Sequence, residues 1–475
     1  MSVTTEVHLL RWKDVYREAE LYKAAVRVYT KPVFQWRKAL SASTDGKTLY
    51  DFAARGLARL DAMHASLQRQ DFEFRPAVAL RYNFNGKHRT MYLPPWEERI
   101  VDLLLYRVLN RRLHHWFSPN SYAYRDRKYS LDACQARIAR ALRSEKAPLY
   151  VVKRDVADYF ASINHEMLLK KVASLVDPKD YLYRLLQQRV RFLYAEDGQL
   201  QSAAIGIPFG TSIACWFANV YLTELDREIE SMPGVRYFRY ADDILLLSSS
   251  RAAAEQASQI LETHLSDLRL RTKPSHRADF LLTTESLSDE SFTVARSFRH
   301  LGLLFRAGGG VALSRDKLRK IRNLFRFAFR RKRRWRREAD ANARAQALVN
   351  LAAETIEKGV RNVAILDYYL KHVNDEEQLR LLDRWLAEEV LSRVFGGHKK
   401  GHFRRIRFSQ LRAMGLPSLL HRHRMICSGR RESPFFIWQR EKAARAFRGT
   451  VARLCRSAGE TAFSPFPEAA ARKSP

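Results

Sequence analysis

Residues 238–247 have the sequence FRYADDILLL, in which two acidic residues stand between two short apolar segments. Apolar residues on either side of Asp242 and Asp243 predict two short strands that flank an acidic turn. Adjacent carboxylates between apolar strands are costly unless a cation compensates their charge. Acidic oxygen ligands select hard cations such as Mg²⁺, and two such ions about 4 Å apart stabilise an in-line phosphoryl displacement. Taken alone, the acidic pair is also compatible with an ordinary solvated turn.

Two earlier segments bear on this choice. The segment LYVVKRDVAD at 149–158 predicts a buried strand that ends in carboxylates, the first of them Asp155. The segment GIPFGTS at 206–212 predicts a turn, and an amphipathic helix over 210–230 follows it. Spacing along the chain does not by itself show that Asp155 meets the acidic pair.

Composition restricts the partners of the protein. The chain has 475 residues, with 84 Lys and Arg against 51 Asp and Glu, which gives a formal net charge of +33. An excess of this size indicates a polyanionic partner, with nucleic acid first and an acidic membrane surface second. Hydrophobic residues make up 46% of the chain and aromatic residues 11%, which argues against a disordered protein. The length allows about three domains.

Cysteine usage and hydropathy indicate a cytoplasmic protein. The four cysteines lie far apart and form no CxxC pair, which disfavours a disulfide scaffold and a cysteine-built zinc site. Neither a signal peptide nor an apolar run of about 20 residues is present. We therefore expect a soluble protein in a reducing cytoplasm, without a membrane partner.

The remaining pattern is largely helical. Apolar spacing predicts helices through most of the first 70 residues, and an Asn85-Gly86 turn predicts a hairpin within 71–95. Helices are also expected over 96–117, where Pro95 suits a helix start, and over 251–270.

A highly basic helix is predicted over 313–338, and it contains 13 Lys and Arg and one acidic residue between Arg315 and Arg337. An amphipathic helical region is expected to continue to about 395, and the tail from Ser457 to be loose.

The order of the motifs resembles a known family. The sequence contains D-V-x-x-Y-F at 155–160, G-I-P-x-G-T-S at 206–212, R-Y-A-D-D at 239–243 and H-L-G at 300–302. This order resembles the palm of a reverse transcriptase. The resemblance is strongest to the bacterial lineage of group II intron proteins, retron enzymes and defence-associated reverse transcriptases.

Three further segments extend the resemblance. Residues 117–125 and 87–93 resemble finger segments of group II intron proteins, and 298–302 resembles the primer grip that closes the palm. The resemblance covers roughly residues 75–335.

The resemblance implies an α+β right-hand polymerase fold, with fingers, a palm built on an antiparallel sheet, a helical thumb and a helical basic C-terminal extension. The expected parts are an N-terminal helical region at 1–74, fingers at 75–148, a palm with finger insertions at 149–307, a helical thumb at 311–395, and a basic extension with a loose tail at 396–475.

For the site, the resemblance implies that Asp155, Asp242 and Asp243 are the catalytic, metal-binding carboxylates. They would hold two Mg²⁺ ions, for which Mn²⁺ could substitute. Nucleotide contacts are implied for the backbone near Asp158 and Tyr159, for Phe160 as a steric gate against a ribose 2′-hydroxyl, for the helix that follows Gly210, and for phosphate-clamping Arg125 and Arg89.

Two positions depart from the family pattern. Phe209 stands where group II intron enzymes usually carry Gln, which removes a hydrogen bond to the incoming nucleotide. His276 stands where the palm places a Lys proposed as general acid for pyrophosphate, with Lys273 close by. Both departures point toward the divergent defence group.

The basic helix takes the place of the thumb, which grips the template–primer duplex. The side chains expected to contact nucleic acid are Arg319, Lys320, Arg330, Arg331, Lys332, Arg333, Arg334, Arg336 and Arg337. A solvated helix face and a nuclear signal are the alternatives for this run.

The expected function is RNA-directed synthesis of DNA from dNTPs, with a dedicated structured non-coding RNA that stays bound and supplies the template. A role in antiviral defence follows from resemblance, because residues 401–405 and 411–419 are similar to extensions of defence-associated enzymes and no cysteine pairs suit an HNH endonuclease. The alternatives are a group II intron maturase or retron enzyme, and a catalytically inactive RNA-binding scaffold. A homo-oligomer or a partner protein is left open.

Overall fold

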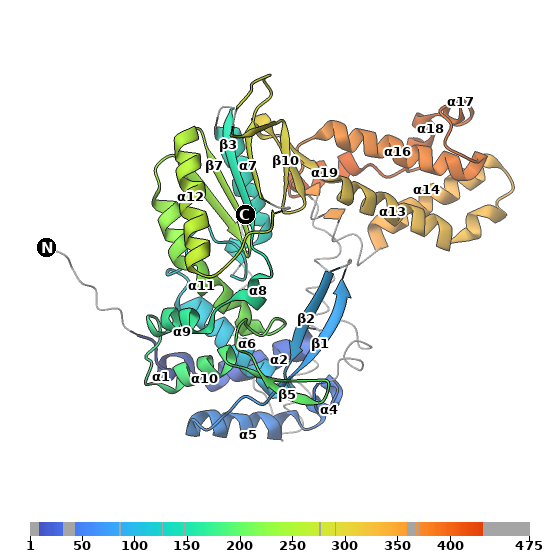
Figure 1. Cartoon of the computed structure of the whole chain (residues 1–475). Helices are drawn as coiled ribbons and strands as arrows, with labels where there is room; N and C mark the ends of the chain where they lie inside the picture. The colour runs from blue at the N-terminus through green and yellow to red at the C-terminus, as the bar shows by residue number, and fades with distance from the viewer. Residues whose placement is uncertain are drawn as a thin grey trace, which may run out of the picture.

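The computed structural model describes residues 9–31, 43–84, 87–125, 127–145, 148–274, 277–289, 291–358, 366–367 and 370–430. The described residues form three β-sheets, and Figure 1 shows a mostly helical, blue-to-green part below the sheet that contains β3 and β7. A helical lobe, orange in the figure, stands beside the green and yellow sheet lobe, and the β1–β2 hairpin lies below it. This arrangement confirms the α+β class.

The central element is a five-stranded sheet, here termed the palm sheet, with the strand order β6-β7-β3-β8-β9. Its pairs are antiparallel except for the parallel β8–β9 pair. The strands are β3 (Leu149–Asp155), β6 (Val235–Tyr240), β7 (Asp243–Ser248), β8 (Ala278–Leu282) and β9 (Thr293–Ala295). The two predicted strands around the acidic turn are therefore confirmed.

Both faces of the palm sheet are covered, which explains the uninterrupted apolar runs at 149–152 in β3 and 244–247 in β7. Val152 and Leu246 point into a core shared with α11 (Ser212–Ser231) and α12 (Arg251–Asp267). Val151 and Leu247 point into a second core on the opposite face, shared with α7 (Leu131–Ser144). Because successive side chains of a strand point to opposite faces, each strand contributes side chains to both cores.

The described residues form two smaller sheets besides the palm sheet. One has the order β2-β1-β4-β5 and the other β10-β11-β12. Their strands are β1 (Ala77–Phe84), β2 (Lys87–Leu93), β4 (Leu193–Glu196), β5 (Gln199–Ser202), β10 (Ser297–His300), β11 (Leu303–Arg306) and β12 (Val311–Leu313). β1 and β2 form the predicted antiparallel pair, while the Asn85-Gly86 turn lies outside the described residues.

The N-terminal helices share the first core rather than forming one of their own. Leu21, Leu60 and Leu104 belong to the same buried cluster as Phe217 of α11. The helices and 3₁₀ turn before the palm are α1 (Trp12–Val15), α2 (Glu18–Thr30), α4 (Leu49–Ala54), α5 (Gly56–Arg69), α6 (Trp96–Arg112) and η1 (Arg127–Tyr129). Those within it are α8 (Tyr159–Ser162), α9 (His165–Ala173) and α10 (Tyr181–Val190), and η3 (Ala307–Gly309) follows the palm sheet.

The helical lobe has a core of its own. Its elements are α13 (Arg315–Arg331), η4 (Arg333–Arg337), α14 (Ala341–Lys358), α16 (Glu376–Phe395), α17 (His402–Arg405), α18 (Phe408–Ala413) and α19 (Leu419–Cys427). Phe325 and Leu386 share this core with Leu411 and Leu419. The expected boundary at 395/396 therefore does not separate two cores, because the described part of the extension packs with the thumb helices.

The expected continuous helix over 313–338 is interrupted. α13 ends at Arg331, and after Lys332 the chain continues as the 3₁₀ turn η4. This turn buries Trp335, whose indole Nε1–H donates to the carbonyl oxygen of Phe329 at 3.1 Å. The gain from burying a large aromatic ring outweighs the local preference for a continuous helix. No helix among the described residues is long and apolar enough to cross a bilayer.

Helix α13 has one buried face and one exposed face, so truncating a phenylalanine on each face should cost different amounts of folding free energy. Phe325 is fully buried, whereas Phe327 is 52% exposed. We expect Phe325→Ala to lower the free energy of unfolding of the helical lobe by about 3–5 kcal/mol, because it leaves a cavity. Phe327→Ala should cost less than about 0.5 kcal/mol. Urea unfolding measures both, and equal losses would contradict this assignment of faces.

Candidate active site

Three carboxylates meet at one edge of the palm sheet. Asp155 ends β3, Asp243 begins β7, and the two residues are paired in register. Asp242 lies in the turn between β6 and β7, and its carbonyl oxygen accepts a hydrogen bond from Val156 N–H at 3.3 Å. The structure thus brings together the acidic residues that are 87 positions apart in the sequence (242 minus 155).

Burial and mutual repulsion govern the charge of this cluster. Burial, followed by the negative charge of Asp155 and Asp242, raises the pKa of Asp243 to about 6. Burial and the charge of Asp155 also raise the pKa of Asp242. Lys273 offsets part of this repulsion, because its ammonium contacts Asp155 Oδ1. The cluster therefore holds its negative charge at a cost that a cation would relieve.

The donor set of the three carboxylates suits a hard divalent cation. Among the described residues, no three acidic, His or Cys side chains are already grouped as a coordination shell. The Asp155 carboxylate instead faces the Lys273 ammonium. The Lys273 ammonium and a bound cation would therefore share the Asp155 carboxylate. His276, expected as a general acid, lies outside the described residues.

Two left-handed residues shape the backbone around the carboxylates. Ala241, just before Asp242, has φ +59°, and Asp158, just before α8, has φ +42°. Tyr159 is buried, and its hydroxyl donates to the carbonyl oxygen of Ala218 at 2.5 Å. The Tyr159 side chain therefore anchors the turn at 158–160 to α11, while Phe160 stays partly exposed.

A wall of aromatic rings stands beside this turn. The Phe160 ring meets the Phe209 ring edge-on at 5.2 Å between centroids and the Tyr124 ring at 6.0 Å. The guanidinium of Arg89, from β2, lies 5.9 Å from the centre of the Phe209 ring. Phe209, predicted to depart from the family pattern, thus packs with the expected gate residue rather than with the core alone.

The fingers hairpin is docked directly on the turn that contains Phe209. Tyr92 N–H of β2 donates to the carbonyl oxygen of Phe209 at 2.9 Å. Gly210 has φ +108°, and a Cβ atom there would lie 2.5 Å from Met91 Cγ. Glycine is needed at this position because both the backbone conformation and the close approach of β2 exclude a side chain.

A cavity of about 690 Å³ opens on this aromatic wall. Its lining includes the three rings of Tyr124, Phe160 and Phe209, together with Gly210 at the start of α11. Four basic side chains that the sequence reasoning did not single out also line it, namely Arg27, Lys31, Arg99 and Arg107. The cavity combines apolar ring faces with positive charge, as a nucleotide or a nucleic acid strand requires.

Arg99 is the most constrained of these basic residues. Its Nε donates to the carbonyl oxygen of Pro94 at 2.8 Å, and its guanidinium lies 4.1 Å from the Trp96 ring centre. Burial lowers the pKa of Arg99 to about 10, and its Nη2 has no hydrogen-bond partner within the described part of the chain. The signal was present in the sequence, since Arg99, Leu103 and Arg107 repeat at helical spacing on α6 and so share one face.

The guanidinium of Arg125, an expected phosphate ligand, is hydrogen-bonded to main-chain carbonyl oxygens. Its guanidinium donates to the carbonyl oxygens of Ser118 at 2.6 Å, Ser121 at 3.0 Å and His114 at 2.7 Å. It also lies 3.6 Å from the centre of the Tyr129 ring. Arg125 does not line the cavity, and its contacts favour a role in holding the 118–125 loop over the expected phosphate contact.

The basic residues predicted to contact nucleic acid are all exposed, on α13, at Lys332 and on η4. The buried residues Ile321, Phe325 and Phe329 mark the opposite side of α13. On the exposed side, the Phe327 ring lies 5.8 Å from the Arg330 guanidinium. An exposed aromatic ring among arginines gives this face both charge and a stacking surface.

Known proteins share this domain. A family model for reverse transcriptase (RNA-dependent DNA polymerase) matches residues 83–304. The chain is 23% identical over 244 residues to Protein YkfC of Escherichia coli (strain K12), which covers 41% of this chain and 61% of that protein. It is 29% identical over 182 residues to the Retron Ec83 reverse transcriptase of Escherichia coli, which covers 38% and 54%. The chain therefore spans about three fifths or less of these two relatives.

Solved structures with similar folds include the apo telomerase from Candida tropicalis truncated from its C-terminal domain. The TM-score is 0.40 at 11% identity, over 58% of this chain and 63% of that one. They also include an insertion-loop deletion mutant of the RNA-dependent RNA polymerase of a human picorbirnavirus. Here the TM-score is 0.43 at 14% identity, over 75% and 64% of the two chains.

The family match confirms both the resemblance indicated by the motif order and the α+β right-hand polymerase fold. All three carboxylates, the aromatic wall and the fingers hairpin strand β2 lie inside the matched segment. Residues 83–304 therefore form a domain that matches the reverse transcriptase (RNA-dependent DNA polymerase) family model.

Proposed function

We propose that this protein is an RNA-directed DNA polymerase that extends a primer with dNTPs. The observation that carries the proposal is the meeting of Asp155, Asp242 and Asp243 at one edge of the palm sheet, inside a reverse transcriptase domain. The neighbouring basic, aromatic cavity supplies a place for the nucleotide and the template. The cluster and the cavity together provide what phosphoryl transfer to a nucleic acid end requires.

The three carboxylates would hold two Mg²⁺ ions, or Mn²⁺ in their place. When bound, the pair of ions would lower the pKa of the primer 3′-hydroxyl and neutralise the charge of the departing pyrophosphate. The chain itself fixes Asp155 and Asp243 on two paired strands and Asp242 in the adjoining turn, so little rearrangement would be needed for the ions to bind. Lys273, which contacts Asp155, would add a positive charge beside them.

The aromatic wall would orient the nucleotide. Phe160 is backed by Phe209 and Tyr124, so its ring has little room to retreat from a ribose 2′-hydroxyl. This packing supports its role as a steric gate that selects dNTPs. Arg89, beside Phe209 on the fingers hairpin, is the better-placed of the two expected phosphate ligands, because Arg125 holds the 118–125 loop.

The exposed side of α13 and η4 would hold the template–product duplex. Arginines contact the phosphates there, and the Phe327 ring stacks on bases or lines a groove. The net charge of +33 exceeds what one duplex requires, which supports a structured RNA that stays bound and serves as the template. We further propose a role in antiviral defence, in line with Phe209 and with the segments at 401–405 and 411–419.

The first test concerns metal binding and its dependence on pH. The folded protein binds a proton at Asp243 more tightly than the unfolded chain does, because the pKa of Asp243 is raised to about 6 in the folded state. Protonated Asp243 therefore stabilises the fold fully below the unfolded pKa, and this stabilisation is lost as the pH rises through about 6. Cations bind the charged form instead. We therefore expect Mn²⁺ to raise the thermal unfolding midpoint clearly at pH 7.5 and little at pH 5. Asp243→Asn should abolish the difference, while Asp197→Asn, in the exposed β4–β5 turn, should preserve it.

The second test is polymerisation itself. The protein with its copurified RNA should incorporate labelled dNTPs in the presence of Mg²⁺. Asp242→Ala should reduce incorporation by at least about 100-fold, because it removes a ligand of the reacting centre. Asp197→Asn serves as the matched control. Equal product from Asp242→Ala would refute the metal assignment, and no product from the intact protein would favour an inactive RNA-binding scaffold.

The third test identifies the bound RNA. Sequencing of the nucleic acid that copurifies should recover one discrete structured RNA, and its recovery should fall several-fold in the triple variant Phe327→Ala, Arg330→Glu, Arg331→Glu. Leu381→Ala, an equally exposed apolar side chain on α16, is the control. Heterogeneous cellular RNA would contradict a dedicated template, and an intron or retron RNA would favour the maturase or retron alternative.

A further inference from the structure

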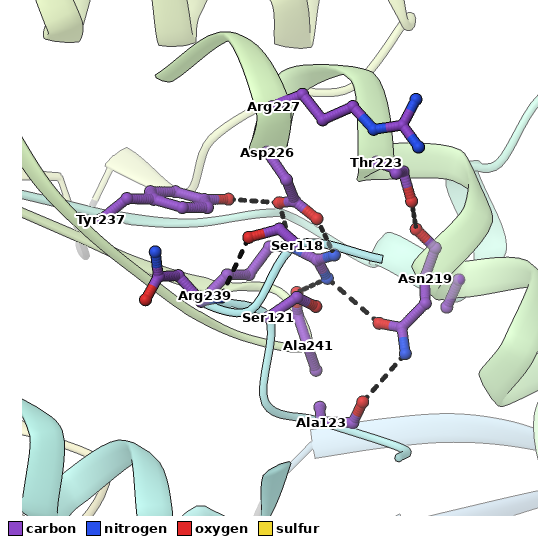
Figure 2. A network of polar contacts seen from close by, with 12 residues as sticks. Ser118, Ser121, Ala123, Asn219, Thr223, Asp226, Arg227, Tyr237, Arg239 and Ala241 are labelled. Carbon is purple, nitrogen blue, oxygen red and sulfur yellow. Dashed lines mark hydrogen bonds and ion pairs between the residues drawn. The ribbon is translucent and has the colours of Figure 1, made fainter. Parts of the chain in front are cut away.

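A buried ion pair lies directly beneath the acidic turn. Arg239 of β6 and Asp226 of α11 are both fully buried. Two guanidinium nitrogens of Arg239 donate to the two Asp226 oxygens at 2.6 and 2.5 Å, and the Tyr237 hydroxyl donates to the same carboxylate at 2.5 Å (Figure 2). The pair is therefore oriented as well as neutralised.

The free corner of the Arg239 guanidinium reaches the acidic turn. Its Nη1 donates to the carbonyl oxygen of Ala241 at 3.1 Å (Figure 2). Ala241 has φ +59°, a left-handed conformation that a residue with a Cβ atom disfavours. The next residue is Asp242, so the bond from Arg239 helps to hold the conformation that presents the carboxylates.

Asn219 extends the network to the cavity. Its Oδ1 accepts from Arg239 Nη1 at 3.3 Å, and its Nδ2 donates to the carbonyl oxygen of Ala123 at 2.9 Å. The residue after Ala123 is Tyr124, which also has φ +59° and whose ring lines the cavity beside Phe160. Figure 2 shows Asn219 between Arg239 and Ala123, joined to each by one hydrogen bond.

Backbone hydrogen bonds join the same two segments. Tyr122 N–H donates to the Arg239 carbonyl oxygen, and Arg239 N–H donates to the Asn120 carbonyl oxygen, each at 2.9 Å. The loop at 118–125 and the strand β6 therefore meet at Arg239 through both side chain and backbone. One buried centre thus supports two strained residues, one next to a carboxylate and one in the cavity wall.

We propose that Arg239 and Asn219 are positioning residues that hold the acidic turn at Asp242 and the cavity wall at Tyr124 in one fixed relation. The proposal rests on the proposed polymerase function. Apolar residues often replace buried ion pairs without loss of stability. The buried, charged Arg239, with its hydrogen bonds to five other residues, therefore indicates that the positions of these residues must be fixed. Neither side chain contacts the cavity, so both act through the residues that they hold.

The test compares two matched buried ion pairs. Arg239→Lys keeps the charge but loses the fork that reaches Ala241. Arg422→Lys makes the same change to the buried Arg422–Asp367 pair of the helical lobe, whose distances are 2.5 and 2.9 Å. Both variants should lower the unfolding midpoint. Only Arg239→Lys should lower kcat for dNTP incorporation, on the order of 10- to 100-fold, with KM for the primer unchanged.

A glycine substitution separates positioning from stability. Glycine adopts the left-handed conformation without penalty, so Ala241→Gly should restore a large part of the kcat lost in Arg239→Lys. Asn219→Ala, which removes no charge, should also lower kcat, but Ala241→Gly should not restore it, because Asn219 holds Ala123 and not Ala241. Unchanged kcat in both variants, or a glycine that lowers kcat further, would overturn the proposal.

A readout that needs no catalysis keeps the two proposals distinguishable. The shift of the unfolding midpoint by Mn²⁺ at pH 7.5 should be smaller in Arg239→Lys than in Arg422→Lys, because the carboxylates are less well placed. If the intact protein makes no DNA but the two variants differ in this shift, the proposed polymerase function is contradicted and the positioning role is supported. Active protein with equal shifts and equal kcat would remove the positioning role alone.

Discussion

Everything in the palm depends on holding three like-charged carboxylates together at a buried edge. The register of β3 and β7 sets Asp155 beside Asp243, and the resulting repulsion raises the pKa of Asp243 to about 6. The fold meets this cost with the Lys273 ammonium and with two cores that fix the strands from both faces. The negative charge concentrated at this edge therefore favours the binding of a cation.

Positive charge gathers at two places in the described part of the chain. Arg27, Lys31, Arg99 and Arg107 line the cavity, and the exposed basic face of α13 and η4 belongs to the separate helical lobe. Under the proposed function, a polyanion would contact both of these basic surfaces while its reacting end lies at the carboxylates. The basic side chains would then attract the nucleic acid that the carboxylates act on.

Local pattern was enough for the elements that carry the site. The apolar runs around Asp242 predicted β6 and β7, and the turn at 206–212 predicted the start of α11, because both signals lie within a few residues. The motif order also identified the family, which the domain match confirmed. Side-chain partners were not predictable. The contacts of Arg125 depend on carbonyl oxygens outside its own position. The basic lining from α6 and the break in the helix at Lys332 depend on packing against other segments of the chain.

Phe209 shows how such partners change the meaning of a single residue. From the sequence, Phe209 is expected to lack a hydrogen bond that Gln would make to the nucleotide. In the structure, its ring contacts the Phe160 ring edge-on, and the Arg89 guanidinium lies near it. A ring offers a base the same contact whichever base it is, since every nucleobase has a π-face. Under the proposed function, selection between bases would therefore have to come from pairing with the template, while the wall would select for the sugar and for a planar base.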